Sequence, residues 1–92
     1  MSITGAQIRA ARAVLRWSAE TLSKRAKVGI QTVKRLEAVD SVSASRPSTL
    51  QQVQATLEAA GIEFVGSPAD RPGIRVTAQV RASGGRKRRL RT

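Results

Sequence analysis

Apolar residues recur every three to four positions through the first two-thirds of the chain, the spacing that buries one face of a helix. The pattern predicts four helices, each preceded by residues suited to a helix start. Thr4 and Gln7 form a capping-box pattern before the first, Ser18 is a suitable cap for the second, and the third begins at or just after Gly29. Ser48 is expected to cap the fourth.

The same spacing predicts where the helices end and which side chains they bury. The first helix should end near Leu15 or Arg16, the third near Glu37 or Ala38, and Gly61 should stop the fourth. The side chains expected on the buried faces are Ile8, Ala11, Val14, Leu15, Leu22, Ala26, Val33, Leu36, Leu50, Val53, Leu57 and Ala60.

After Gly61 the pattern changes to alternation of apolar and polar residues, which is typical of strands. Residues 62–65 and 73–80 are predicted to be two short antiparallel strands, separated by the turn-forming stretch "GSPADRP". Two strands alone are only marginally stable, so they need cover from the helices or from a second subunit. The expected fold is mainly α: a helical bundle over 1–61, a strand pair over 62–80 and a basic, flexible tail over 81–92.

Charge indicates the kind of partner. The 92 residues include 17 Lys and Arg against 6 Asp and Glu, a formal net charge of +11. Without the six basic residues of the tail, the remaining 11 still exceed the acidic residues by five. Such a surface favours a polyanionic partner, nucleic acid before an anionic membrane. The tail residues are Arg81, Arg86, Lys87, Arg88, Arg89 and Arg91.

The chain has neither cysteine nor histidine, so disulfides, thiolate metal sites and histidine catalysis are excluded. No pair of carboxylates stands at a spacing that suggests general acid–base chemistry, so no enzyme activity, metal or cofactor is expected. The apolar runs are too short to span a membrane, and the start of the chain does not resemble a signal peptide. We expect a cytoplasmic protein that associates with the nucleoid.

The second and third predicted helices carry the functional signal. Leu22, Ala26, Val28, Val33 and Leu36 are spaced so that two short helices can pack closely across a tight turn. Such a pair can place its second helix in the major groove of DNA. This packing would leave a set of polar and basic side chains facing outward, together with one isoleucine. They are Ile30, Gln31, Thr32, Lys34 and Arg35.

Residues 3–61 resemble the helix-turn-helix domain of the Cro/Xre repressor family, whose fold is the lambda-repressor-like bundle. The resemblance rests on "IRAAR", "WSAETLSKRAKV", "TVKRLEA" and "RPSTLQQVQATLEAAG" in this order. It implies that the start of the third helix reads base edges and that flanking residues hold phosphates. The implied base-reading residues are Ile30, Gln31, Thr32 and Arg35. The expected phosphate contacts are Ser18, Ala19, Lys27, Lys34, Ser43 and Arg46.

The residue types suit these roles, although each has a structural alternative. Gln31 can pair with adenine and Arg35 with guanine, while Ile30 and the Thr32 methyl can contact thymine. Ile30 could instead be half-buried core, and Gln31 and Thr32 could be ordinary solvated residues. Trp17 is expected to fill the core.

The resemblance also implies one structural ion pair, and the sequence differs from the family pattern at one position of the turn. Arg12 and Glu37 match a pair that links the first and third helices. Lys27 stands where glycine is favoured, because the residue that ends a helix often has φ > 0. Two solutions remain open: Lys27 tolerates the strain, or Gly29 supplies the freedom and reshapes the turn.

The leading functional hypothesis is a homodimeric regulator of bacterial or phage type, most simply a repressor, that binds a palindromic operator in double-stranded DNA. The strand pair would form the dimer contact through Phe64, Val65, Ile74 and Val76. One alternative is an antitoxin whose C-terminal segment also binds a regulatory partner protein, the toxin. Another is an architectural protein that binds nucleic acid without sequence preference through its tail.

Overall fold

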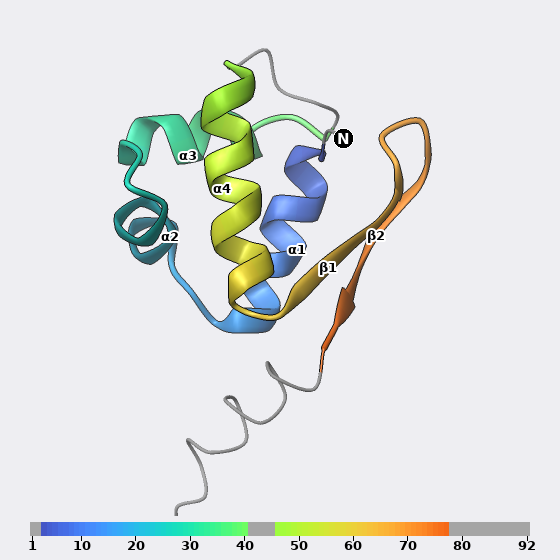
Figure 1. Ribbon diagram of the computed structural model, residues 1–92. Helices are drawn as coiled ribbons and strands as arrows, with labels where there is room; N and C mark the ends of the chain where they lie inside the picture. The colour runs from blue at the N-terminus through green and yellow to red at the C-terminus, as the bar shows by residue number, and fades with distance from the viewer. Residues whose placement is uncertain (1–2, 41–45, 78–92) are drawn as a thin grey trace, which may run out of the picture.

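Four helices followed by a two-stranded hairpin make up the described part of the chain, residues 3–40 and 46–77 of a computed structural model (Figure 1). The helices are α1 (Gly5–Leu15), α2 (Ala19–Ala26), α3 (Ile30–Glu37) and α4 (Pro47–Ala59). The strands are β1 (Ile62–Ser67) and β2 (Asp70–Val76), which pair in antiparallel fashion. The prediction of a mainly helical chain with a C-terminal strand pair is therefore confirmed.

Three of the four predicted helix starts are also confirmed. The Thr4 hydroxyl accepts the Gln7 N–H at 3.1 Å, and the Gln7 side-chain oxygen accepts the Thr4 N–H at 2.8 Å. The Ser18 hydroxyl accepts the Thr21 N–H at 3.0 Å, and Gly29 precedes α3. These bonds satisfy donors that a helix start leaves without partners.

The predicted start of α4 is wrong. The helix begins at Pro47 with Arg46 as its capping residue, so Ser48 already lies inside it. Proline is well suited to the first helical position, because its φ is preset and its missing N–H would have no partner there.

The core lies where the two short helices, α1, α4 and the hairpin meet, and it contains most of the side chains predicted to be buried. Its members are Ile3, Ile8, Ala11, Leu22, Ala26, Val33, Leu36, Leu50, Val53, Leu57, Ile62 and Phe64. Trp17, which was expected to fill the core, is only half-buried and packs against this cluster from its edge.

Val14 is a correction to the predicted core, because its side chain is 39% exposed. It follows Ile8 by six residues, a rotation that leaves it roughly 120° around the helix from Ile8 and so on the flank of α1. Leu15, one residue on, returns toward that face and is half-buried. Where apolar residues are adjacent near a helix end, their spacing alone does not show which of them are buried.

The hairpin pairs Ile62 with Val76 and Phe64 with Ile74, with an irregularity between Val65 and Ser67. The strands take up most of the segment expected to be a loop, so the turn is shorter than predicted. The expected continuation of β2 over 78–80 lies outside the described residues. No helix in the described ranges has the length and apolar character needed to cross a membrane.

The hairpin is attached to the helices along one face. The Gln7 side-chain amide donates to the carbonyls of Val65 at 3.2 Å and Gly73 at 2.8 Å, which links α1 to both strands. Phe64 is 7% exposed, and Ile74 and Val76 pack partly against the core. Three of the four side chains expected at a dimer contact are thus used within one chain. Val65, one position along from Phe64, lies on the opposite face of the strand.

Candidate nucleic-acid interface

The backbone of the turn between α2 and α3 shows whether Lys27 or Gly29 accommodates the end of α2. Lys27 has φ 59° and ψ 43°, the left-handed conformation, and its N–H donates to the Ser23 carbonyl. The Val28 N–H also donates to that carbonyl, at 3.1 Å, as in a Schellman-type helix end. Gly29 has an ordinary extended conformation, with φ −69°. The strain is therefore carried by Lys27, and the alternative in which Gly29 reshapes the turn is wrong.

Two polar contacts that the sequence pattern did not predict hold this turn. The buried Ser23 hydroxyl donates to the Val28 carbonyl at 2.7 Å, which joins α2 to the turn that follows it. The Gln52 side chain donates to the Ala26 carbonyl at 3.0 Å, which fastens α4 to the end of α2. Both carbonyls lie in or beside the turn, so its backbone is held from two directions.

Packing between α2 and α3 follows the prediction. Leu22, Ala26, Val33 and Leu36 are between 0% and 2% exposed, and Val28 is half-buried beside them. The small side chain of Ala26 allows the two helices to approach closely. This packing fixes which side of α3 remains outward.

The outward side of α3 carries the residues expected to read bases. Gln31, Lys34 and Arg35 are exposed, whereas Ile30 and Thr32 are half-buried. Within the described ranges, the Arg35 side chain makes one hydrogen bond, to the Thr32 hydroxyl at 3.5 Å. Arg35 is therefore weakly held and can reach outward, while Ile30 and Thr32 offer only part of their surface.

The predicted ion pair between Arg12 and Glu37 is confirmed, and it is bidentate. The Arg12 Nε and Nη2 atoms each lie 2.8 Å from a Glu37 carboxylate oxygen, and Nη1 donates to the Trp17 carbonyl at 3.0 Å. The hydrogen bond to Glu37 raises the pKa of Arg12 above its already high ordinary value. One guanidinium thus joins α1, α3 and the connection to α2.

A second arginine of α1 holds the end of α3. Arg9 donates to the Glu37 carbonyl and to the Asp40 carboxylate. Helical periodicity does not predict these contacts, because a partner 31 positions away in the sequence leaves no local signal. With Arg12, this residue fixes the orientation of α3 on the bundle.

The remaining basic residues divide into two groups. In the described ranges, four arginines form ion pairs: Arg9 with Asp40, Arg12 with Glu37, Arg71 with Asp70, and Arg75 with Glu63. The other seven basic residues there have no ion pair with a described residue. They are Arg16, Lys24, Arg25, Lys27, Lys34, Arg35 and Arg46.

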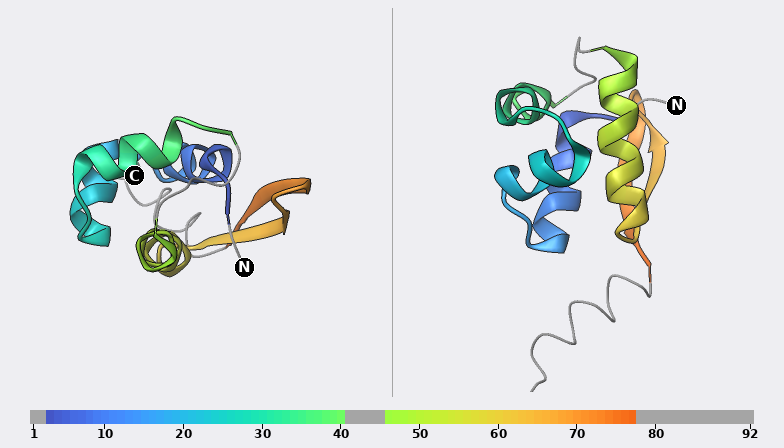
Figure 2. Two further views of the ribbon diagram at one scale, coloured as in Figure 1. Left: turned by 90° about the horizontal axis from the view of Figure 1, so that it is seen from above. Right: turned by 60° about the vertical axis from the view of Figure 1, so that its left-hand side comes forward.

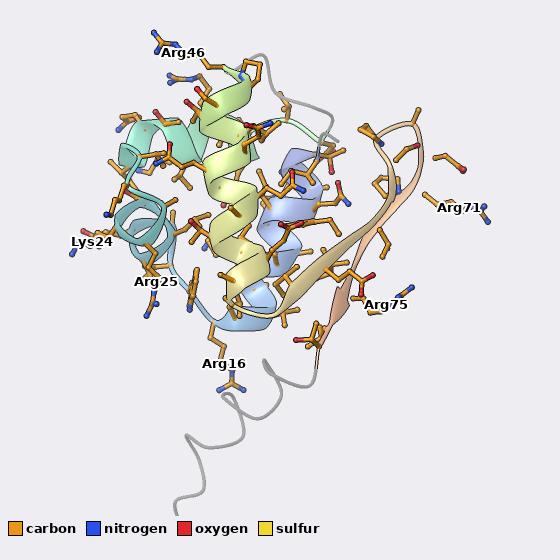
Figure 3. The ribbon with its side chains drawn as sticks, in the orientation of Figure 1. Arg16, Lys24, Arg25, Arg46, Arg71 and Arg75 are labelled. Atoms are coloured by element: carbon orange, nitrogen blue, oxygen red, sulfur yellow. The ribbon has the colours of Figure 1, made fainter. Side chains whose placement is uncertain are left out.

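The basic residues with and without an ion pair lie in different parts of the molecule. Five of the seven unpaired residues lie on α2, on α3 or in the turn between them, and Arg16 and Arg46 directly follow α1 and precede α4. Figure 3 shows Lys24 and Arg25 pointing outward on the α2 side, with Arg71 and Arg75 on the hairpin at the other side. The uncompensated positive charge therefore gathers around α2 and α3.

The other expected phosphate contacts are placed less directly. The Ser18 hydroxyl is engaged as the cap of α2, and Ala19 packs partly against the core, so this helix start can offer backbone N–H groups. Glu20 adds a negative charge to the same turn. Arg46 is exposed at the start of α4. Ser43 and the basic tail lie outside the described residues.

Comparison of the chain with protein-family models, with curated proteins and with solved structures found no match. Its function must therefore be inferred from its own residues.

Proposed function

We propose that this protein is a sequence-specific, double-stranded DNA-binding transcriptional regulator that acts as a homodimer and places α3 in the major groove. The observation that carries the proposal is the division of charge. Acidic partners neutralise the arginines of α1 and the hairpin, whereas the basic residues around α2 and α3 have none among the described residues. The resemblance of residues 3–61 to the Cro/Xre family supports the same reading.

The outward face of α3 has the chemistry for reading base edges. Gln31 and Arg35 are exposed polar side chains of the types that pair bidentately with adenine and guanine. Thr32 and Ile30 can add apolar contact with a thymine methyl through the surface they leave exposed. A rigid connection to the bundle through Arg12 and Glu37 would keep these groups in register with the bases.

Phosphate contacts would come from the residues around that face. Lys34 on α3 and Lys27 in the turn have no acidic partner among the described residues, and Arg46 stands at the start of α4. The backbone N–H groups at Ser18 and Ala19 would add an anion contact at the start of α2. Such contacts set affinity and orientation and carry no sequence information.

Arg35→Ala should lower affinity for the cognate site by about 1–3 kcal/mol and relax the preference at one base pair, because a bidentate contact is lost. Gln31→Ala should behave in the same way at another position. Fluorescence anisotropy with cognate and scrambled duplexes would measure both effects.

Lys34→Ala is the matched control on the same helix, since it removes a charge directed at phosphate. It should weaken binding to both duplexes equally and make the salt dependence shallower by about one charge. Equal losses on both duplexes for Arg35→Ala would show that this residue does not read a base.

The hairpin is the proposed dimer contact, through backbone rather than through buried side chains. Figures 1 and 2 show it projecting on the side of α1 and α4 away from α2. The Thr77 N–H donates to the Gly61 carbonyl at 3.0 Å, so with this register the backbone groups of Phe64 and of Ile74 point away from the other strand. Strand edges of this kind pair readily with a second chain.

Sedimentation equilibrium should give twice the mass of one chain. Deleting the hairpin is not a usable test, because Ile62 and Phe64 are core residues. Amide hydrogen exchange tests the dimer contact more directly. If β1 pairs with the second chain, the Phe64 amide should exchange slowly, and if β2 does, the Ile74 and Val76 amides should. The Arg75 amide, which points toward β1, serves as an internal reference. A monomer, or fast exchange at all three edge amides, would rule out this contact.

A further inference from the structure

The residues with left-handed backbone share an unexpected property. Apart from glycines, three described residues have positive φ: Arg16 at 60°, Lys27 at 59° and Arg71 at 51°. All three are basic, although glycine adopts this conformation without steric cost. Two of them, Arg16 and Lys27, directly follow α1 and α2.

Arg16 ends α1 in the left-handed conformation that Lys27 adopts at the end of α2, and in both cases the next residue donates to the carbonyl five positions back. The Arg16 N–H donates to the Ala13 carbonyl at 3.1 Å, and the Trp17 N–H donates to the Arg12 carbonyl at 3.0 Å. This Schellman arrangement requires the left-handed conformation and makes no use of a side chain. A glycine would therefore complete the same helix end with less strain.

The Arg16 side chain does not contribute visibly to the fold. It is exposed, and within residues 3–40 and 46–77 it makes no hydrogen bond and no ion pair. Non-glycine residues held in this conformation cluster at active sites and ligand contacts, so a ligand contact is a hypothesis to test for Arg16.

Its position indicates which role. Arg16 lies two residues before Ser18, the cap of α2, where the proposed function already places a phosphate. In Figure 3 Arg16, Arg25 and Lys24 project from the α1–α2 side, and Arg46 projects at the other end of the bundle. The Arg25 guanidinium lies 4.7 Å from the centre of the ring of Trp17, the residue that follows Arg16 in the chain.

We propose that Arg16 is a phosphate-binding residue, held at the left-handed end of α1 to contact the DNA strand that passes the start of α2. The proposal rests on the proposed function and adds a contact that the spacing of the recognition helix does not predict. It explains why a charged residue occupies a position where glycine would strain the backbone less.

Arg16→Gly in the full-length chain provides a test with two effects of opposite sign. The variant should melt a few degrees higher, because the backbone strain is relieved. Its affinity for a fluorescein-labelled duplex of mixed sequence should fall roughly five- to tenfold at 0.1 M salt, and the salt dependence should become shallower by about one charge. Arg16→Lys, which keeps the charge, should retain most of the affinity.

Arg71→Gly is the matched control. It relieves the same backbone conformation and removes the same charge, but from the hairpin, where Arg71 is paired with Asp70 and its side chain is 91% exposed. We expect a similar gain in melting temperature with less than a twofold change in affinity. Equal affinities for Arg16→Gly and Arg71→Gly would overturn the assignment, and so would a lower melting temperature for Arg16→Gly.

Failure of this inference can be distinguished from failure of the proposed function. If Lys34→Ala and Lys27→Gly weaken binding and Arg16→Gly does not, α3 still faces DNA and only the Arg16 contact is wrong. If the unsubstituted chain does not bind the duplex, or none of the three substitutions changes binding, both proposals are wrong.

Discussion

Replacing Gly5 with alanine should destabilise the protein by about 3 kcal/mol or more, even though alanine is the better helix former. A Cβ atom at Gly5 would lie 2.0 Å from the Val39 carbonyl oxygen and 2.5 Å from that of Leu36. Both atoms belong to the backbone, so no side chain can rotate to make room. The start of α1 would have to move away from the end of α3.

Gly29→Ala is the control for this substitution. A Cβ atom there would meet only the Thr32 hydroxyl, at 3.8 Å, and the backbone of Gly29 is extended, so the change should stay within about 1 kcal/mol. Urea unfolding, followed by the fluorescence of the single tryptophan, Trp17, would measure both variants. A Gly5→Ala protein as stable as the unsubstituted chain would show that α1 and α3 are not in this close contact.

Arg12→Ala should cost about 3 kcal/mol of unfolding free energy, because it leaves the Glu37 carboxylate without its bidentate partner. The Glu37 side chain is only 9% exposed, so water can compensate little of the loss. The Trp17 carbonyl would lose its hydrogen bond from Arg12 as well. Since the pair orients α3, DNA affinity should fall with stability.

An exposed arginine provides the comparison. Arg75 lies 3.4 Å from Glu63, and both side chains are more than half exposed, so Arg75→Ala should cost no more than about 0.5 kcal/mol. The same urea titration measures both variants. Similar losses for Arg12→Ala and Arg75→Ala would contradict a structural role specific to the pair between α1 and α3.

Local patterns were enough to predict the elements of this fold. Helix starts at Thr4, Ser18 and Gly29 depend on residues within three positions, and the structure has all three. The start of α4 was misplaced because Ser48 is a good cap in isolation, whereas Pro47 had already fixed the helical backbone. Val14 was misplaced for a similar reason, since periodicity alone does not give the width of a buried face.

Contacts between distant parts of the chain could not be predicted in this way. The Gln7 amide reaches carbonyls 58 and 66 positions away on the hairpin. Gly5 looks like an ordinary, slightly unfavourable helix residue until α3 is placed beside it. Arg12 and Glu37 could be paired beforehand only through the resemblance to a family.

The candidate nucleic-acid interface, too, could be predicted only as far as local patterns reach. The spacing of Leu22, Ala26, Val33 and Leu36 determines which side of α3 faces outward, so the exposure of Gln31 and Arg35 could be predicted. The number of basic residues can be counted in the sequence, but local patterns do not show which of them meet an acidic partner. That distinction depends on tertiary contacts, and it now carries the functional proposal.

The most direct test of the central claim is selection of bound sequences from random double-stranded DNA, followed by sequencing. We predict enrichment of a single two-fold symmetric site, with half-sites about one helical turn (~34 Å) apart, and loss of preference at one base pair of each half-site for Arg35→Ala. Retention of DNA without any enriched sequence, or an enriched sequence that Arg35→Ala leaves unchanged, would contradict base readout by α3.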